Sequence, residues 1–338
     1  MRNSKLKTRI DYFDVLRGIG IVYMVLGHIY LGEVFDKYIH AFHMPIFFFV
    51  SGYFYNGDKY KAAKNYLLHE MRTLMVPYTF FVIICQVLHY IYTKEFSVSY
   101  FLLSYISSNN NRIDVAGAYW FLLCLFVVKL IYFVLTKYIK NPYVQTTIVV
   151  CITLYGNFTE RELLFCLESA MSCLAFIHIG YLMKKNWVKV SCLFSIPMRG
   201  IVILFIINIS LIFINGDVNI RTNRYSNVFL FWINSITAII CYTNLAKRIE
   251  NSAIVIIGKI AKGLKYIGKN SMAFLVVNEI TIYGVRQMIE WVHIYNGNEM
   301  GIGYSCFVNI LVFLLTMIVI CIFNEVVCCT KMRVILGR

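Results

Sequence analysis

Apolar residues occupy most of this chain in runs that recur from one end to the other, separated by short polar segments. Runs of about 20 residues match the roughly 30 Å core of a bilayer at about 1.5 Å of rise per residue. We therefore predict an all-α membrane protein, a polytopic bundle of about ten transmembrane helices in a single domain over residues 1–338. The predicted spanning segments are 12–31, 39–57, 73–93, 114–136, 142–157, 163–183, 199–215, 224–245, 268–289 and 303–327.

The basic residues are distributed unevenly between alternate polar segments. Of the 32 Lys and Arg, 23 fall in segments that share a side with the N-terminus, 7 lie on the opposite side and 2 lie within spans. Because Lys and Arg in short loops favour the cytoplasm, this asymmetry predicts a multi-pass protein of the cell membrane with both termini cytoplasmic. It also accounts for the net charge of +15. The basic residues are divided among six segments, which argues against nucleic-acid binding.

Composition supports the membrane assignment and limits the chemistry. Hydrophobic residues make up 59% of the chain and charged residues only 14%, whereas soluble domains carry about a quarter. The 11 cysteines are scattered through apolar runs, without metal-ligand spacing, and we interpret them as small core residues. Two amphipathic stretches, 59–72 and 251–266, are predicted to lie at the lipid headgroups or to offer cations to an anionic cytosolic ligand.

Ionisable residues inside the first apolar segment are the leading candidates for chemistry. Charged or titratable groups in a spanning helix are costly and usually functional. Arg17 and His28 are eleven residues apart, which places them on nearly the same helix face, about 16 Å apart along the axis. Asp14 lies one turn before Arg17 and can pair with it. A purely structural ion pair and an interfacial histidine remain the alternative interpretation.

The second apolar segment adds two histidines near the same membrane surface as His28. It begins HAFHMPIFFFVSGYF, with His40 and His43 at its outer end. A zinc site would need further ligands, and no carboxylate or thiolate stands at ligand spacing, so no metal is predicted. His43 is either a structural donor or a second catalytic or substrate-binding group. Ser51 and Gly52 form a small notch suited to close helix packing, and Ser51 is also a candidate for binding the donor or the substrate.

These segments resemble a known family. The run FDVLRGIGIVYMVLGH, followed by FHMPIFFFVSGYF, is similar to the acyltransferase 3 family of integral membrane acyltransferases, whose hallmark is an Arg, ten residues and a His in the first helix. Three later pieces fit in order: MRTLMVPYTFF, AYWFLLCLF and YIGKNSMAFLVVNE. Relatives often carry a His near the position of Asn278, so the role of that late histidine does not carry over.

The resemblance implies transfer of an acyl group, usually acetyl, from cytoplasmic acyl-CoA to a hydroxyl of a cell-surface polysaccharide or its lipid-linked glycan precursor. Acetyl-CoA would be a co-substrate, with no permanently bound cofactor. His28 would be the general base, Arg17 and Arg72 would bind the donor, and Asp14 would orient Arg17. The acidic partner of His28 would come from outside its helix, and the candidates are Glu33, Glu279 and Glu290.

Other polar and aromatic residues keep two interpretations each. Lys129 and Glu168 either pair as a structural bridge or line the donor channel. Tyr119 and Trp120 are either interfacial anchors or a stacking surface for a sugar ring or the thioester. A secondary transporter or flippase is the alternative function, but the sequence shows neither paired broken helices nor a half-to-half repeat. A glycan polymerase would need a larger outer loop than residues 94–113.

Overall fold

The computed structural model describes residues 11–60, 62–95, 97–106, 117–292 and 302–338, and these residues are almost entirely helical. The long helices are α1 (Asp11–Ile29), α5 (Val76–Thr93), α7 (Trp120–Tyr138), α8 (Pro142–Phe158), α9 (Leu167–Lys185), α11 (Met198–Asn215), α12 (Val228–Glu250), α13 (Val255–Lys269), α14 (Ser271–Trp291) and α15 (Ile302–Cys328). The short helices are α2 (Glu33–His40), α3 (His43–Tyr53), α4 (Ala63–Glu70), α6 (Val98–Ile106) and α10 (Trp187–Val190). One two-stranded hairpin pairs β1 (Val218–Asn219) with β2 (Arg224–Tyr225).

A helical membrane bundle is confirmed. Each of the ten predicted segments corresponds to a helix, and in the described part of the chain seven helical segments are long and apolar enough to cross a membrane. The segment predicted at 39–57 is shorter than expected, because α3 has only 11 residues, about 16 Å of rise. The segment predicted as an outer loop, 94–113, contains α6.

Helix α3 lies inside the bundle, and ten of its 11 residues are buried. Small residues allow it to pack closely against α9. A Cβ built on Gly52 would overlap the Ile177 carbonyl oxygen, and one on Gly180 would overlap the Phe49 carbonyl oxygen. The predicted packing notch is therefore confirmed at Gly52, where the two backbones meet.

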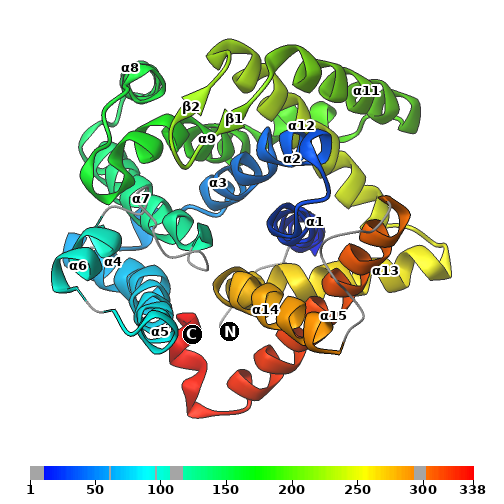
Figure 1. Cartoon of the computed structure of the whole chain (residues 1–338). Helices are drawn as coiled ribbons and strands as arrows, with labels where there is room; N and C mark the ends of the chain where they lie inside the picture. Colours follow the sequence, from blue (N-terminus) through cyan, green and yellow to red (C-terminus); the bar gives the residue numbers. More distant parts are fainter. Residues whose placement is uncertain (1–10, 61, 96, 107–116, 293–301) are drawn as a thin grey trace, which may run out of the picture.

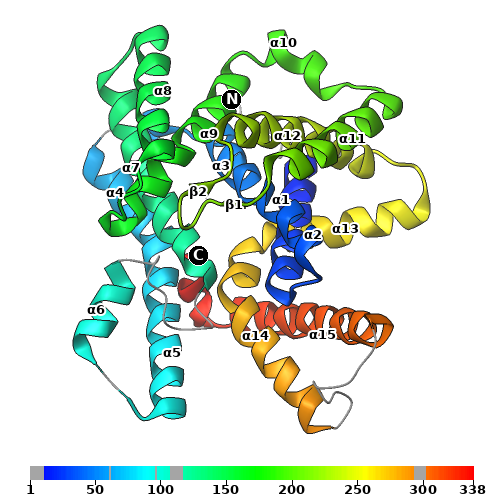
Figure 2. The same ribbon diagram turned by 45° about the horizontal axis from the view of Figure 1, so that its top comes forward.

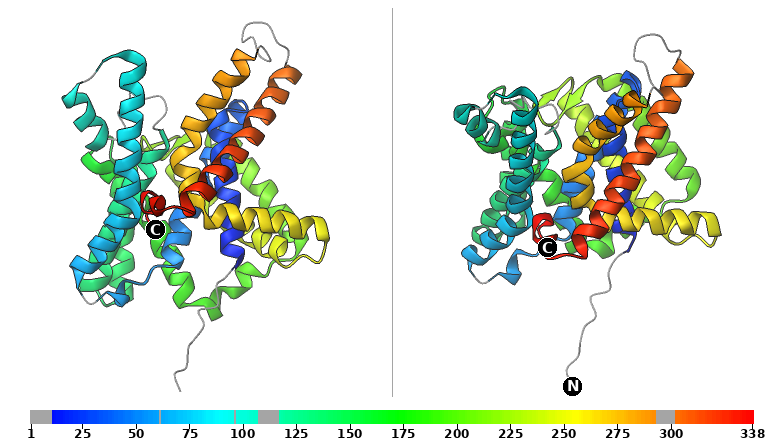
Figure 3. Two further views of the ribbon diagram at one scale, coloured as in Figure 1. Left: turned by 90° about the horizontal axis from the view of Figure 1, so that it is seen from below. Right: turned by 60° about the horizontal axis from the view of Figure 1, so that its bottom comes forward.

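Helix α1 lies near the middle of the molecule, with α3, α12, α13 and α14 around it (Figure 1). The amphipathic stretch predicted at 251–266 forms most of α13, which runs across the lower end of α1 (Figure 3). A Cβ on Gly18 would overlap the Leu264 carbonyl oxygen, and one on Gly268 would overlap the Asp14 carbonyl oxygen. These glycines let α13 approach the turn of α1 that carries Asp14 and Arg17.

Candidate functional site

A cavity of about 490 Å³ lies at the His28 end of α1, and we call it the histidine cavity. Its walls come from α1, α2, α3, α7, α14 and the β1–β2 hairpin, so segments far apart in the sequence meet there. The lining residues are Met24, His28, His40, His43, Met44, Gly117, Ala118, Trp120, Phe121, Asn219, Ile220, Arg221, Leu275, Glu279, Ile282, Tyr283 and Arg286.

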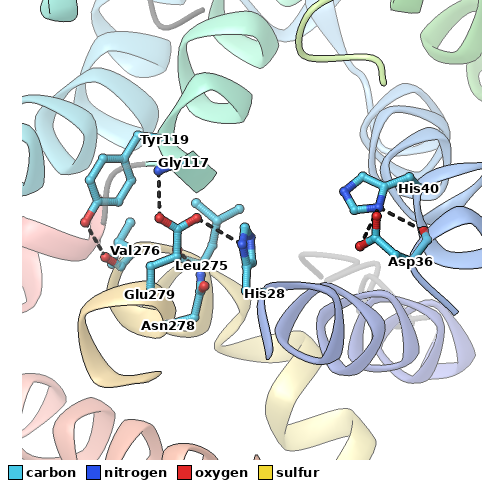
Figure 4. Close-up of polar contacts among 9 residues, drawn as sticks. All are labelled: His28, Asp36, His40, Gly117, Tyr119, Leu275, Val276, Asn278 and Glu279. Carbon is cyan, nitrogen blue, oxygen red and sulfur yellow. Dashed lines mark hydrogen bonds and ion pairs between the residues drawn. The ribbon is translucent and has the colours of Figure 1, made fainter. Parts of the chain in front are cut away.

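His28 pairs with Glu279 in the wall of this cavity. Its Nδ1 lies 3.1 Å from Glu279 Oε1, while the other carboxylate oxygen accepts a 2.7 Å hydrogen bond from the Gly117 backbone N–H (Figure 4). A carboxylate at Nδ1 favours the imidazole tautomer that carries its proton there, which leaves Nε2 able to accept one. The His28 side chain is 32% exposed, so it is accessible from the cavity.

Of the three acidic residues predicted as partners, only Glu279 contacts His28. Glu33 pairs with Lys37 at 2.7 Å, and Glu290 is exposed beside Gln287. Asn278, the position where relatives often carry a histidine, is buried and donates to the Leu275 carbonyl oxygen at 2.7 Å. Glu279, the next residue along α14, supplies the carboxylate that reaches the cavity.

The two histidines of the second segment line the same cavity, as their position predicted. His43 Nδ1 lies 2.7 Å from the Ile39 carbonyl oxygen, which can only accept, so Nδ1 is the donor. His40 lies 3.3 Å from the Asp36 carboxylate on its own helix (Figure 4). Among the described residues, no group of three or more His, Cys, Asp or Glu could hold a metal ion.

A second, smaller cavity of about 290 Å³ lies at the Arg17 end of α1, and we call it the arginine cavity. Arg17 Nη1 lies 3.4 Å from Asp14 Oδ1, which confirms the predicted pair, and its guanidinium carbon lies 5.0 Å from the centre of the Phe54 ring. Phe121 and Leu275 line both cavities, which are therefore adjacent. The other lining residues are Ile21, Phe47, Ser51, His69, Thr73, Leu74, Leu122, Leu125, Lys129, Ser271 and Met272.

Arg72, predicted to bind the donor with Arg17, does not line the arginine cavity. It is exposed within a π-helical turn, Met71–Met75, that joins α4 to α5. His69 and Thr73, which are four residues apart and lie near one helix face, line the cavity instead. A donor contact from Arg72 stays a prediction.

The predicted pairing of Lys129 with Glu168 is wrong. Lys129 pairs with Glu70, a carboxylate that is 2% exposed in the last turn of α4. Glu168 instead accepts the backbone N–H of Leu163 at 3.0 Å. Sequence reasoning missed Glu70 because it falls in the stretch 59–72, which we expected to lie at the lipid headgroups. Lys129, which lines the arginine cavity, adds a second cation there.

Tyr119 and Trp120 have separate roles. Tyr119 is buried, and its hydroxyl donates to the Val276 carbonyl oxygen at 2.7 Å, so it is not an interfacial anchor (Figure 4). Since Val276 lies one turn before Glu279, this bond helps to position α14. Trp120 lines the histidine cavity, which is compatible with the predicted stacking surface.

Comparison with known proteins identifies the family of nearly the whole chain. The acyltransferase 3 family model, described as an acyltransferase domain, matches residues 10–324. No curated protein and no solved structure matches the chain. The match covers α1 with both cavities, the hairpin and α14. The chain therefore belongs to the acyltransferase 3 family, and it is a membrane acyltransferase.

Proposed function

We propose that the protein is an O-acetyltransferase that moves an acetyl group from acetyl-CoA to a hydroxyl of a surface polysaccharide or its lipid-linked glycan precursor. The arrangement of the two cavities along α1 is the observation that supports this most. One has cations suited to an anionic donor, the other has a histidine held by a carboxylate, and Phe121 and Leu275 line both. Arg17 and His28 are about 16 Å apart along the helix, a distance of the same order as the pantetheine arm of CoA.

In this mechanism, the donor enters at the Arg17 end and extends its thioester past Phe121 and Leu275 to His28. The acceptor hydroxyl donates its proton to His28 Nε2 as its oxygen attacks the thioester carbonyl carbon. Glu279 keeps the ring in the tautomer that can accept this proton and stabilises the imidazolium that forms. When the tetrahedral intermediate collapses, the C–S bond breaks and His28 returns the proton to the CoA sulfur.

The experiment that tests this function uses membranes of the protein's own host, which contain the acceptor. Radiolabelled acetyl-CoA should transfer its acetyl group to membrane glycan only when the protein is present. Mass spectrometry of the surface glycan from strains with and without the gene should show the loss of one acetyl mass per modified unit. A labelled product from membranes that lack the protein, or none from membranes that contain it, would refute the proposal.

Replacing Arg17 by lysine should weaken donor binding about tenfold. Lysine keeps the charge but loses the planar fork and the stacking over Phe54, and a hydrogen bond to a charged group is worth about 1.5–3 kcal/mol. Calorimetric titration of the purified protein with CoA measures the affinity directly. If affinity is unchanged while acetyl transfer falls, Arg17 acts in the chemical step or in folding and not in donor binding.

The orientation of the chain fixes the direction of transfer, and cysteine labelling tests it. With native reactive cysteines removed, a cysteine at Lys262, which is exposed on α13, should label only from the cytoplasm. Cysteines at Lys5 and Asn298, which lie outside the described residues, should label from the cytoplasm and from outside, respectively. Labelling of the cysteine at position 262 from outside would show that the acetyl group moves in the opposite direction to the one proposed.

A further inference from the structure

The histidine cavity contains two arginines, and the structure distinguishes their roles. Arg286 Nη2 donates to the Ile29 carbonyl oxygen at 2.7 Å, at the last residue of α1, and lies 3.4 Å from Asn309 Oδ1. It therefore satisfies the end of the helix that carries His28 and ties that end to α14 and α15. Arg221 comes from the β1–β2 hairpin and belongs to neither α1 nor α14.

Arg221 stands beside the His28–Glu279 pair. A Cβ built on Gly117 would lie 2.7 Å from Glu279 Oε1 and 3.3 Å from Arg221 Nη1, so carboxylate and guanidinium converge on the same point in front of Gly117. Burial lowers the pKa of Arg221, and the Glu279 carboxylate raises it. Because an arginine side chain does not lose its proton in proteins, a full positive charge faces the cavity.

The β1–β2 hairpin that carries Arg221 lies against the helices of the bundle (Figure 2), and hydrogen bonds hold it there on both sides of this residue. Ser169 Oγ on α9 lies 2.9 Å from the Ile220 carbonyl oxygen and 3.3 Å from that of Arg221. Asn223 Nδ2 donates to the Gly156 and Thr159 carbonyl oxygens at 2.7 and 3.0 Å. The backbone of Arg221 is thus held in place without a substrate, which is the preorganisation that electrostatic catalysis requires.

Acetyl transfer needs such a charge. When the acceptor oxygen attacks, the π electrons of the thioester carbonyl move onto its oxygen, which becomes an oxyanion until the C–S bond breaks. A fixed cation is worth most where water is excluded, and apolar side chains such as Met24, Met44 and Ile282 form much of this cavity wall. His43 cannot stabilise the oxyanion in its neutral form, because Nδ1 carries its proton and Nε2 only accepts.

We propose that Arg221 is a further catalytic residue, which polarises the thioester carbonyl and stabilises the oxyanion while His28 takes the proton. This role rests on the proposed function. Two residues on different elements then handle the two charges of the transition state. His28 on α1 becomes the imidazolium, and Arg221 on the hairpin stabilises the oxyanion of the substrate.

Arg221→Gln tests the role in full-length protein in host membranes, with labelled acetyl-CoA as donor. Removing an oxyanion-stabilising donor typically costs about 10²–10³-fold. We expect a loss of about 100-fold in the transfer rate at saturating donor, at every pH, with the half-saturating acetyl-CoA concentration changed less than about threefold. Arg224→Gln is the matched control, because Arg224 is exposed on the same hairpin and does not line the histidine cavity. It should leave the rate unchanged.

A second measurement distinguishes whether Arg221 activates the thioester carbonyl or binds the acceptor. Purified protein without glycan should release thiol slowly from acetyl-CoA, with water replacing the acceptor hydroxyl, and Arg221→Gln should slow this hydrolysis as much as it slows transfer. Should this variant lose acetyl-CoA binding, Arg221→Lys carries the test. It keeps the charge without the fork and should lower the saturated rate about tenfold with donor affinity intact.

Three results would overturn the role. These are a rate within about threefold of wild type, full recovery of the rate at higher pH, and a loss confined to transfer with hydrolysis intact. In each of them the wild-type protein still transfers acetyl, so the proposed function survives. If the wild-type protein transfers no acetyl from acetyl-CoA, the proposed function fails and the role of Arg221 fails with it.

Discussion

Replacing His28 by alanine should abolish acetyl transfer while the protein remains folded in the membrane. General-base catalysis is typically worth about 10²–10⁴-fold, and within the described residues no other histidine lies in contact with Glu279. His28 is partly exposed to the cavity, so its removal leaves space without disturbing the buried core around α1. The measurement is transfer of labelled acetyl from acetyl-CoA to membrane glycan, normalised to the amount of protein in the membrane.

His89→Ala is the control for this substitution. His89 lies on α5 and lines neither the histidine cavity nor the arginine cavity, so its loss should leave transfer within about twofold of wild type. Retention of more than about a tenth of the activity by His28→Ala would sink the role of general base. Loss of CoA binding in the same variant would instead indicate misfolding.

The sequence alone was sufficient to predict the helical bundle and the placement of Arg17 and His28 along one helix. Runs of apolar residues determine membrane helices directly, because each backbone polar group must be satisfied within its own helix. The helical repeat determines the relation of Arg17 to His28, and α1 keeps both in one uninterrupted helix. The pairing of Asp14 with Arg17 follows from the same local geometry and is confirmed.

Contacts between distant segments were harder to predict. Glu279 was one of three candidates for the partner of His28, because its distance from α1 depends on how α14 packs and not on its own position in the sequence. Lys129 was assigned the wrong carboxylate for a related reason. Its partner Glu70 lies in an amphipathic stretch that predicts a position at the lipid headgroups. The π-helical turn that follows α4 cannot be recognised from the pattern of apolar residues.

Arg221 shows a further limit of sequence reasoning. In the sequence it is one of seven basic residues on the outer side, in a short polar segment without an apolar pattern. Only the pairing of β1 with β2, and the bonds from Ser169 and Asn223, bring it to the cavity. Short loops between membrane helices therefore contribute to this site in a way that hydropathy does not reveal.

Replacing Glu279 by glutamine should lower acetyl transfer about 10²–10⁴-fold, although the side chain keeps its size. The carboxylate accepts only, which favours the His28 tautomer with its proton on Nδ1. A glutamine amide can donate to Nδ1 instead and so favour the tautomer with the proton on Nε2, where His28 can no longer act as a base. The imidazolium formed in the reaction also loses its counter-charge, as in other histidine–carboxylate pairs.

The matched control is Glu290→Gln, because Glu290 lies on the same helix but is exposed beside Gln287. It removes the same charge from α14 and should leave the rate within about twofold of wild type. Calorimetric titration with CoA should give wild-type affinity for both variants. Glu279 lines the histidine cavity, whereas Arg17 lines the arginine cavity at the other end of α1. Full activity of Glu279→Gln would show that His28 acts without the carboxylate. Loss of CoA binding in that variant would show that Glu279 holds α14 against α1 and serves the fold.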